Sequence, residues 1–341
     1  MPISVFKPTI KRRDMDAVLS CLVSEQIGPG TLSTILVREA SSYLSISGGF
    51  ALREYKRAIE LVFDAMEICE GDSVVISPLS PSVYFDACST RGIRMLFADV
   101  DPNSACIDPS HVEVLLDKNP AACVVDSPVG FVPRMDSLSE LAIPIIEDVT
   151  NCIGAIADWG KVGGFGRFVI VGLEEENIIT AGGGAVVLSQ TKRDLGLLRK
   201  SAIAIDQSGL LPDLNAALAL TQLKHIEEFI DKRRDIAQVY HRAIMKGRHR
   251  TLTQDKSSEN VFASFPVILD GSVREVMKYA RSKDIITRET FSESILARIS
   301  DQNADCPNAQ NLYLRCILFP LYPMLRKTHI QEISRVLSTL P

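Results

Sequence analysis

Two aspartates, each at the end of a predicted strand, are the residues with the clearest chemical potential. Asp126 ends the apolar run AACVVD (121–126), and Asp148 ends IPIIED (143–148). Short, nearly continuous apolar runs that alternate with helical segments are typical of a parallel sheet buried on both faces. Because ligands of such sheets bind at the carboxyl ends of the strands, we expect both carboxylates at a ligand-binding edge.

A second candidate site is a basic cluster of Arg53, Lys56 and Arg57, with Tyr55 as a further anion or ligand candidate, at the N-terminus of a helix predicted over residues 51–68. The cluster has two interpretations. It is a solvated basic turn, as most charge clusters are, or it is an anion site for a nucleotide diphosphate or another acidic ligand. The second interpretation rests on the helix N-terminus and the cations attracting an anion together.

Cysteine and histidine spacing predicts no metal site. None of the eight cysteines forms a C-x-x-C pair and most lie in apolar segments, which favours buried free thiols in a reducing compartment. The five histidines show no metal-ligand spacing.

Composition restricts the class of protein. The chain has 341 residues with 46% hydrophobic and 23% charged residues, enough for one large domain and a smaller one. Its net charge of -5 argues against a nucleic-acid-binding surface. No apolar run has the length of a membrane span, and the first residues lack the apolar stretch of a signal peptide. We therefore expect a cytoplasmic protein with no membrane or nucleic-acid partner.

The predicted elements divide the chain in two. Strands and helices alternate up to residue 148, and the runs 168–173 and 185–189 are expected to pair around a turn. A long helical stretch, 214–245, is expected to bend or to run along the outside as a connector. The polar segment after it suggests a large domain over 1–248 and a small α+β domain over 249–341.

Six segments then occur in an order that resembles the DegT/StrS-type sugar aminotransferases. They are IGPG (27–30), IEDVTNCIGA (146–155), GKVGGFG (160–166), NIITAGGGAVV (177–187), the helical run 214–240 and the C-terminal run 308–337. Members of this family are dimers of the aspartate aminotransferase fold that use pyridoxal phosphate (PLP) to aminate keto sugars on nucleotide carriers. The resemblance implies an α/β fold with a mostly parallel central sheet of the PLP-dependent transferase type.

The resemblance assigns roles to two residues of the IEDVTNCIGA segment. Asp148 matches the aspartate that pairs with the pyridinium nitrogen of the cofactor, so that the ring acts as an electron sink. Asn151 falls where the family often has a glutamine near the phenolic oxygen of the ring.

The lysine that the family uses for its Schiff base is missing from the aligned position. An ungapped count puts Glu176 there, and a one-residue slip would put Asn177 there. Neither side chain can form an imine, and no lysine occurs between Lys161 and Lys192. We expect Glu176 to be catalytically inactive. A second interpretation makes it one of three solvated acids in the loop 174–176.

The phosphate and ring positions also depart from the family pattern. Tyr55 and Lys56 replace a Gly-Thr pair, and their bulk is expected to fill the phosphate position. Gly172 replaces a serine and has no hydroxyl. The stacking position falls within residues 79–85, where Tyr84 could serve only if the register slips.

These departures lead to two hypotheses. In the first, the chain is a degenerate homologue of nucleotide-sugar aminotransferases that does not transaminate, holds no cofactor as a covalent aldimine, and serves as a ligand-binding or partner subunit in carbohydrate biosynthesis. In the alternative, it is an active aminotransferase or a dehydratase-like enzyme using PLP or pyridoxamine phosphate (PMP). Both predict a homodimer, and a nucleotide sugar is the ligand that the resemblance implies.

Overall fold

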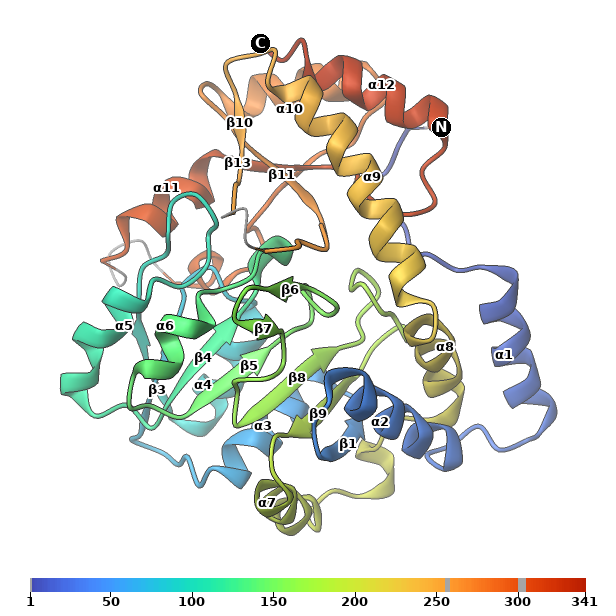
Figure 1. Ribbon diagram of the computed structural model, residues 1–341, viewed down its shortest axis with the longest axis vertical. Coiled ribbons are helices and arrows are strands. Elements are labelled where there is room, and N and C mark those ends of the chain that lie inside the picture. Colours follow the sequence, from blue (N-terminus) through green and yellow to red (C-terminus); the bar gives the residue numbers. More distant parts are fainter. Residues whose placement is uncertain (1, 255–257, 300–304) are drawn as a thin grey trace.

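The computed structural model describes residues 2–254, 258–299 and 305–341. A large lobe is built on a seven-stranded sheet and a small lobe on a four-stranded sheet (Figure 1). The strands of the large sheet, in spatial order, are β1 (Gly48–Leu52), β9 (Ala185–Ser189), β8 (Phe168–Gly172), β5 (Ile145–Asp148), β4 (Ala122–Asp126), β2 (Ser73–Ile76) and β3 (Arg94–Phe97).

This sheet confirms the predicted α/β fold. Its strands from β8 to β3 run parallel, whereas β9 and β1 are antiparallel to their neighbours. The predicted strand pair around a turn is β8 with β9. The predicted helix over 51–68 is wrong at its start, because Ala51 and Leu52 pair with β9 as part of β1 and helix α3 (Tyr55–Ala65) begins only at Tyr55.

Helices cover both faces of the large sheet, since successive strand residues point to opposite sides. Val74 and Ile76 pack with α3, α4 and α7, whereas Val75 packs on the opposite face with α5 and α6. Helices α2 and α8 cover the same face as α5 and α6, over β8 and β9. The bounds are α2 (Thr31–Leu44), α4 (Ser82–Arg91), α5 (Pro109–Leu115), α6 (Met135–Glu140), α7 (Lys192–Ala202) and α8 (Asp213–Leu223).

The small lobe is an antiparallel sheet covered by helices. Its strands, in spatial order, are β10 (Arg250–Thr251), β11 (Phe265–Ile268), β13 (Cys316–Phe319) and β12 (Arg288–Glu289). Its helices are α10 (Val273–Ser282), α11 (Pro307–Arg315) and α12 (Lys327–Leu337). The predicted division after residue 248 falls just before β10. Ile3 of the N-terminal segment nevertheless packs in the core of the small lobe.

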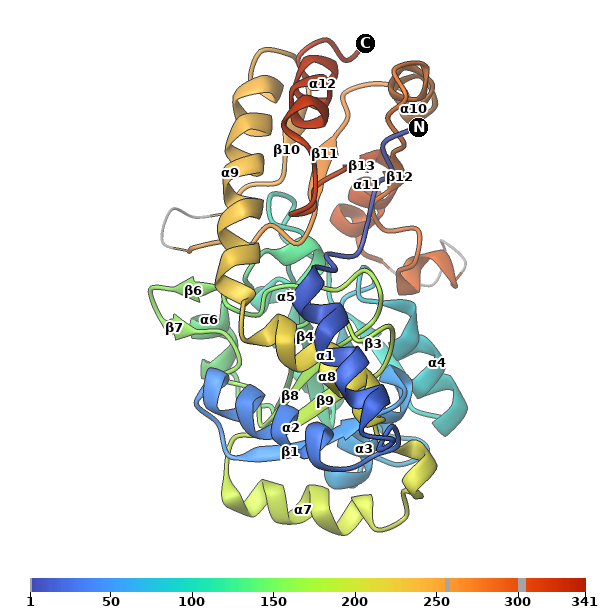
Figure 2. The same ribbon diagram turned by 90° about the vertical axis from the view of Figure 1, so that its right-hand side faces the viewer.

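The predicted helical stretch 214–245 is two helices, α8 and α9 (Ile226–Ile244), separated at Lys224 and His225. Figure 2 shows α9 running from the large lobe to the small lobe. Ile230 of its first half is buried in the core of the large lobe, whereas Tyr240 of its second half is buried in the core of the small lobe. Because α9 takes part in both cores, it is a connector buried along one side.

All eight cysteines are free thiols, and Cys69 is the exposed one. Within the described ranges, no group of three or more histidine, cysteine, aspartate or glutamate residues could hold a metal ion. No helix in the described part of the chain is long and apolar enough to cross a membrane.

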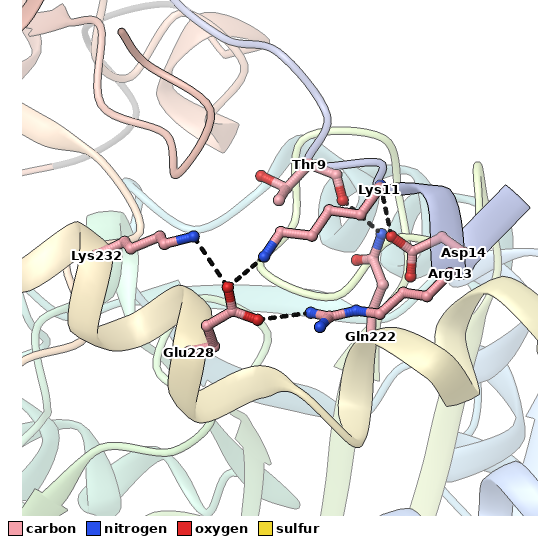
Figure 3. Close-up of polar contacts among 7 residues, drawn as sticks. All are labelled: Thr9, Lys11, Arg13, Asp14, Gln222, Glu228 and Lys232. Carbon is pink, nitrogen blue, oxygen red and sulfur yellow. Dashed lines mark hydrogen bonds and ion pairs between the residues drawn. The ribbon is translucent and has the colours of Figure 1, made fainter. Parts of the chain in front are cut away.

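Glu228 of α9 ties the N-terminal segment to the connector (Figure 3). Its carboxylate contacts Lys11, Arg13 at 2.8 Å and Lys232 at 2.9 Å. Nearby, the Gln222 amide donates to the carbonyl of Thr9 at 3.1 Å. These contacts place helix α1 (Arg12–Val23) beside α8 (Figure 2).

We predict that Glu228→Gln destabilises the protein by less than about 1 kcal/mol, because the ion pairs are partly exposed. Hydrogen bonds from Lys11, Lys232 and Arg13 hold the pKa of Glu228 well below its ordinary value of 4.5. The stabilisation is therefore present above that value and lost as the pH falls below it. Urea unfolding at neutral pH, in low and high salt, measures the difference, which salt should reduce.

Asp231→Asn is the matched control, because Asp231 is an exposed acid on the same helix whose one ion pair, with Arg234, is 4.0 Å long. Equal effects of the two substitutions would contradict the role of Glu228.

Candidate functional site

A cleft of about 780 Å³ lies at the carboxyl ends of β4, β5 and β8, where the two lobes meet. Asp126 and Asp148 line its floor, and Arg288, Thr290 and Ser294 line it from the small lobe. The two aspartates are direct partners in the register of β4 and β5. The structure thus brings both predicted carboxylates to one ligand-binding edge.

Asp148 is 2% exposed and accepts four hydrogen bonds from the chain itself. Its Oδ2 accepts from the hydroxyl of Tyr55 and from that of Tyr84, the latter at 2.7 Å. Its Oδ1 accepts from the hydroxyl of Thr150 at 2.5 Å and from the backbone N–H of Thr150 at 3.1 Å. A carboxylate has about four acceptor positions, so those of Asp148 are filled.

The two tyrosines come from the N-terminal turns of neighbouring helices. Tyr55 is the first residue of α3 and Tyr84 lies in the first turn of α4, with ring centroids 6.4 Å apart in an edge-to-face arrangement. Burial and then the charge of Asp148 raise the pKa of both phenols well above its usual value, so both hydroxyls keep their protons and donate. The sequence indicates Tyr55 as an anion or ligand candidate and Tyr84 as a stacking residue in a slipped register, but it does not predict that both donate to Asp148.

Glu176 lies in the loop between β8 and β9 and pairs with Arg288 of β12. The guanidinium donates to both carboxylate oxygens, at 2.9 and 2.5 Å, and so links the two lobes across the cleft. Asn177 instead stabilises the turn of this loop, because its side-chain oxygen accepts a hydrogen bond from the backbone N–H of Glu174 at 2.7 Å. No sequence pattern pointed to Arg288, which is 112 residues from Glu176.

A side chain at Gly172, where the family pattern has a serine, would be crowded by two neighbouring side chains. A Cβ atom there would lie 3.0 Å from the side-chain oxygen of Asn177 and 3.1 Å from that of Thr150. The Thr150 hydroxyl also accepts from the backbone N–H of Gly172 at 2.7 Å. A side chain at this position would therefore disturb the group that caps Asp148.

The three cations of the basic cluster point to different partners. Arg53 donates to the carbonyl of Ser208 at 2.8 Å, and Lys56 donates to the hydroxyl of Thr90 at 2.8 Å. Arg57 pairs with Glu60 at 3.1 Å and does not line the cleft. Of the Tyr55–Lys56 pair, it is the Tyr55 side chain that reaches Asp148.

The glycine-rich segment 160–166 wraps around a buried carboxylate. Glu147 accepts the backbone N–H groups of Gly163 at 2.6 Å, Phe165 at 3.1 Å and Gly166 at 2.8 Å. Gly166 could carry no side chain, because its Cβ would lie 2.8 Å from the backbone nitrogen of Glu147. This segment positions the end of β5, and these three N–H groups are unavailable to a phosphate.

Asp126 differs from its neighbour Asp148 in having open acceptor positions. It is 5% exposed, and Ser80 is the described side chain that donates to it, at 2.5 Å. Burial raises its pKa from 3.8 to about 7; the hydrogen bond from Ser80 opposes this shift and the charge of Asp148 adds to it. Asn151, half-buried, lines the same cleft.

The fold and the cleft at its strand ends define the class of PLP-dependent transferases. Residues 8–338 match the sequence profile of the DegT/DnrJ/EryC1/StrS aminotransferase family, and the chain belongs to this family. It is 24% identical to a dTDP-4-dehydro-2,3,6-trideoxy-D-glucose 4-aminotransferase of Saccharopolyspora spinosa, over 97% of this chain and 95% of the relative.

Two solved structures share the fold. Helicobacter pylori PseC, an aminotransferase involved in the biosynthesis of pseudoaminic acid, superimposes with a TM-score of 0.90 at 17% identity, over 99% of this chain and 98% of that one. Spr1654 of Streptococcus pneumoniae in its PMP form superimposes with a TM-score of 0.90 at 16% identity, over 99% of this chain and 97% of that one. The family and these neighbours indicate an ancestry among PLP-dependent enzymes.

The residues of this cleft do not fit such a cofactor. A pyridinium N–H needs a free acceptor on the carboxylate, and the chain fills all four positions of Asp148. A phosphate needs the backbone N–H groups at the start of a helix, but α3 begins with Tyr55 directly after the carboxylate of Glu54.

We predict that Asp126→Asn stabilises the protein at pH 8 by up to about 3 kcal/mol and has little effect near pH 4. As the pH rises from 3.8 to about 7, the carboxyl ionises in the unfolded chain before it does so in the folded protein. Folding therefore loses stability over this range, and a neutral amide removes that loss. Urea unfolding at both pH values measures the effect. A pH-independent difference, or destabilisation at pH 8, would contradict the assignment.

Proposed function

We propose that this chain is a member of the family that does not transaminate and that binds a small molecule in its cleft without a pyridoxal cofactor. The observation that carries the proposal is the set of hydrogen bonds on Asp148. Tyr55 and Tyr84 supply hydroxyl donors where a cofactor ring would need to donate. A ring that entered would have to displace two buried phenols from their acceptor.

The distribution of lysines supports the same proposal. Among the described residues that line the cleft, Lys56 is the one lysine, and its ammonium group is bound to Thr90. Glu176 is held by Arg288, and moving it would break a bidentate ion pair.

We predict that PLP added to the purified protein forms no aldimine in the cleft. No visible aldimine absorption should appear, and borohydride should fix no PLP on a cleft residue. The physical reason is that the cleft offers neither a free lysine nor a free acceptor on Asp148. Mass spectrometry after borohydride treatment is the measurement, with a PLP-dependent aminotransferase treated identically as the control. A covalent adduct on any cleft residue would overturn the proposal.

The alternative is an enzyme that uses PLP or PMP, as an aminotransferase or in a dehydratase-like reaction. It is favoured by the family match over residues 8–338 and by the presence of Asp148 at the end of β5. Reversible binding of PMP without a covalent adduct, together with release of Tyr55 from Asp148, would favour the dehydratase-like form.

A homodimer is the assembly that we propose. Helix α1 presents a run of apolar side chains to solvent, with Met15 at 56%, Leu19 at 58% and Val23 at 76% exposed. Large exposed apolar side chains that gather on one helix are typical of an interface. The family resemblance also implies a homodimer.

We predict that the wild-type chain runs as a dimer in size-exclusion chromatography with light scattering, and that Leu19→Glu with Val23→Glu yields a folded monomer. Charges in an apolar interface weaken association strongly, because they lose hydration without gaining a partner. The control is Val114→Glu, a substitution at another exposed apolar position, on α5. A wild-type monomer would refute the proposed assembly.

A further inference from the structure

The cleft has an excess of negative charge. Its lining includes seven carboxylates, from Glu54, Asp126, Asp148, the loop 174–176 and Glu293, against the three basic side chains of Arg53, Lys56 and Arg288. Of these basic groups, Arg288 is already paired with Glu176. A diphosphate, and therefore a nucleotide sugar, would be repelled by this lining, whereas a cation would be attracted.

The wall that the small lobe contributes has polar atoms with no partner. Eight buried side-chain atoms of the described residues lack a hydrogen-bond partner, and four of them belong to residues that line this cleft. They are the hydroxyls of Ser264, Thr290 and Ser294 and the Nε of Arg288. Ser294 is 3% exposed, so its hydroxyl is a buried group that a ligand in the cleft could satisfy.

The floor offers one open carboxylate for a cation. Asp148 is filled by four donors, whereas Asp126 beside it receives the Ser80 hydroxyl on Oδ1. A buried carboxylate left partly unpaired lowers stability, and such groups are typical of binding and catalytic sites. A single open carboxylate can pair with an organic ammonium ion, whereas a metal site needs several ligands, and no group of three or more occurs among the described residues.

We propose that the cleft binds a hydroxylated primary amine in its protonated form, with the ammonium group against Asp126 and the ligand hydroxyls against Ser264, Thr290 and Ser294. A cleft of about 780 Å³ accommodates a molecule of monosaccharide size or larger. This ligand class rests on the proposed function, because a bound cofactor would occupy the same space.

Three probes that differ at a single carbon test the proposal by isothermal titration calorimetry at pH 8 on the full chain. They are 6-amino-6-deoxyglucose, glucose and glucose 6-phosphate, which are cationic, neutral and anionic. We expect the amine to bind at least about tenfold more tightly than glucose, and the phosphate to show no binding. Glucose binding as tightly as the amine, or preferential binding of the phosphate, would overturn the proposal.

Single substitutions test which cleft residues contact the bound amine. Asp126→Asn should leave the protein folded and weaken amine binding by at least about tenfold, and Ser294→Ala should weaken binding of the amine less, by about threefold. Asp231→Asn, on the exposed face of α9 and outside the cleft, should leave binding unchanged. Amine binding that is unaffected by Asp126→Asn would overturn the site.

The two proposals fail in different ways. Trapping of PLP on a cleft residue by borohydride would overturn the proposed function and the ligand class together. A protein that forms no PLP adduct in the cleft and also binds no amine would overturn the ligand class alone.

Discussion

The hydrogen bonding of Asp148 is the constraint on which the site depends. The carboxylate lies at the end of β5, between the first turns of α3 and α4, and both helices direct a tyrosine hydroxyl to the same oxygen. Because the remaining oxygen is taken by Thr150, the group behaves as a structural acceptor in the core. The N-terminal turns of two helices and the end of one strand are thereby held together.

Asp126 shows how different two adjacent carboxylates can be in one sheet. The residues are register partners on parallel strands and both are buried. Asp148 accepts from four donors, whereas Asp126 accepts from a single side-chain donor. Burial raises the pKa of Asp126 to about 7. The floor of the cleft thus combines a closed carboxylate, which organises the helices, with an open one that is available to a ligand.

The two lobes are joined by a helix and by an ion pair. Helix α9 is buried in both cores, and the ion pair between Glu176 and Arg288 crosses the cleft. Glu176, which the family resemblance leads us to expect at the lysine position, contacts the small lobe through its charge. An arginine–carboxylate pair of this geometry also restricts how far the cleft can open.

The alternation of buried strands and helices was readable from the sequence, because the spacing of apolar residues is a local property. So was the placement of Asp126 and Asp148, since parallel strands bring their carboxyl ends to one edge. The start of α3 was misjudged because β1 needs β9, which lies more than a hundred residues away, to form a strand.

Only the tertiary structure decided what the site residues contact. Tyr84 and Asp148 are 64 residues apart, and Glu176 and Arg288 are 112 apart. A sequence shows which side chains can donate or accept, but it does not show which of them share a space. That pairing depends on how the helices and the two lobes pack, and it determines whether each carboxylate is closed, open or paired.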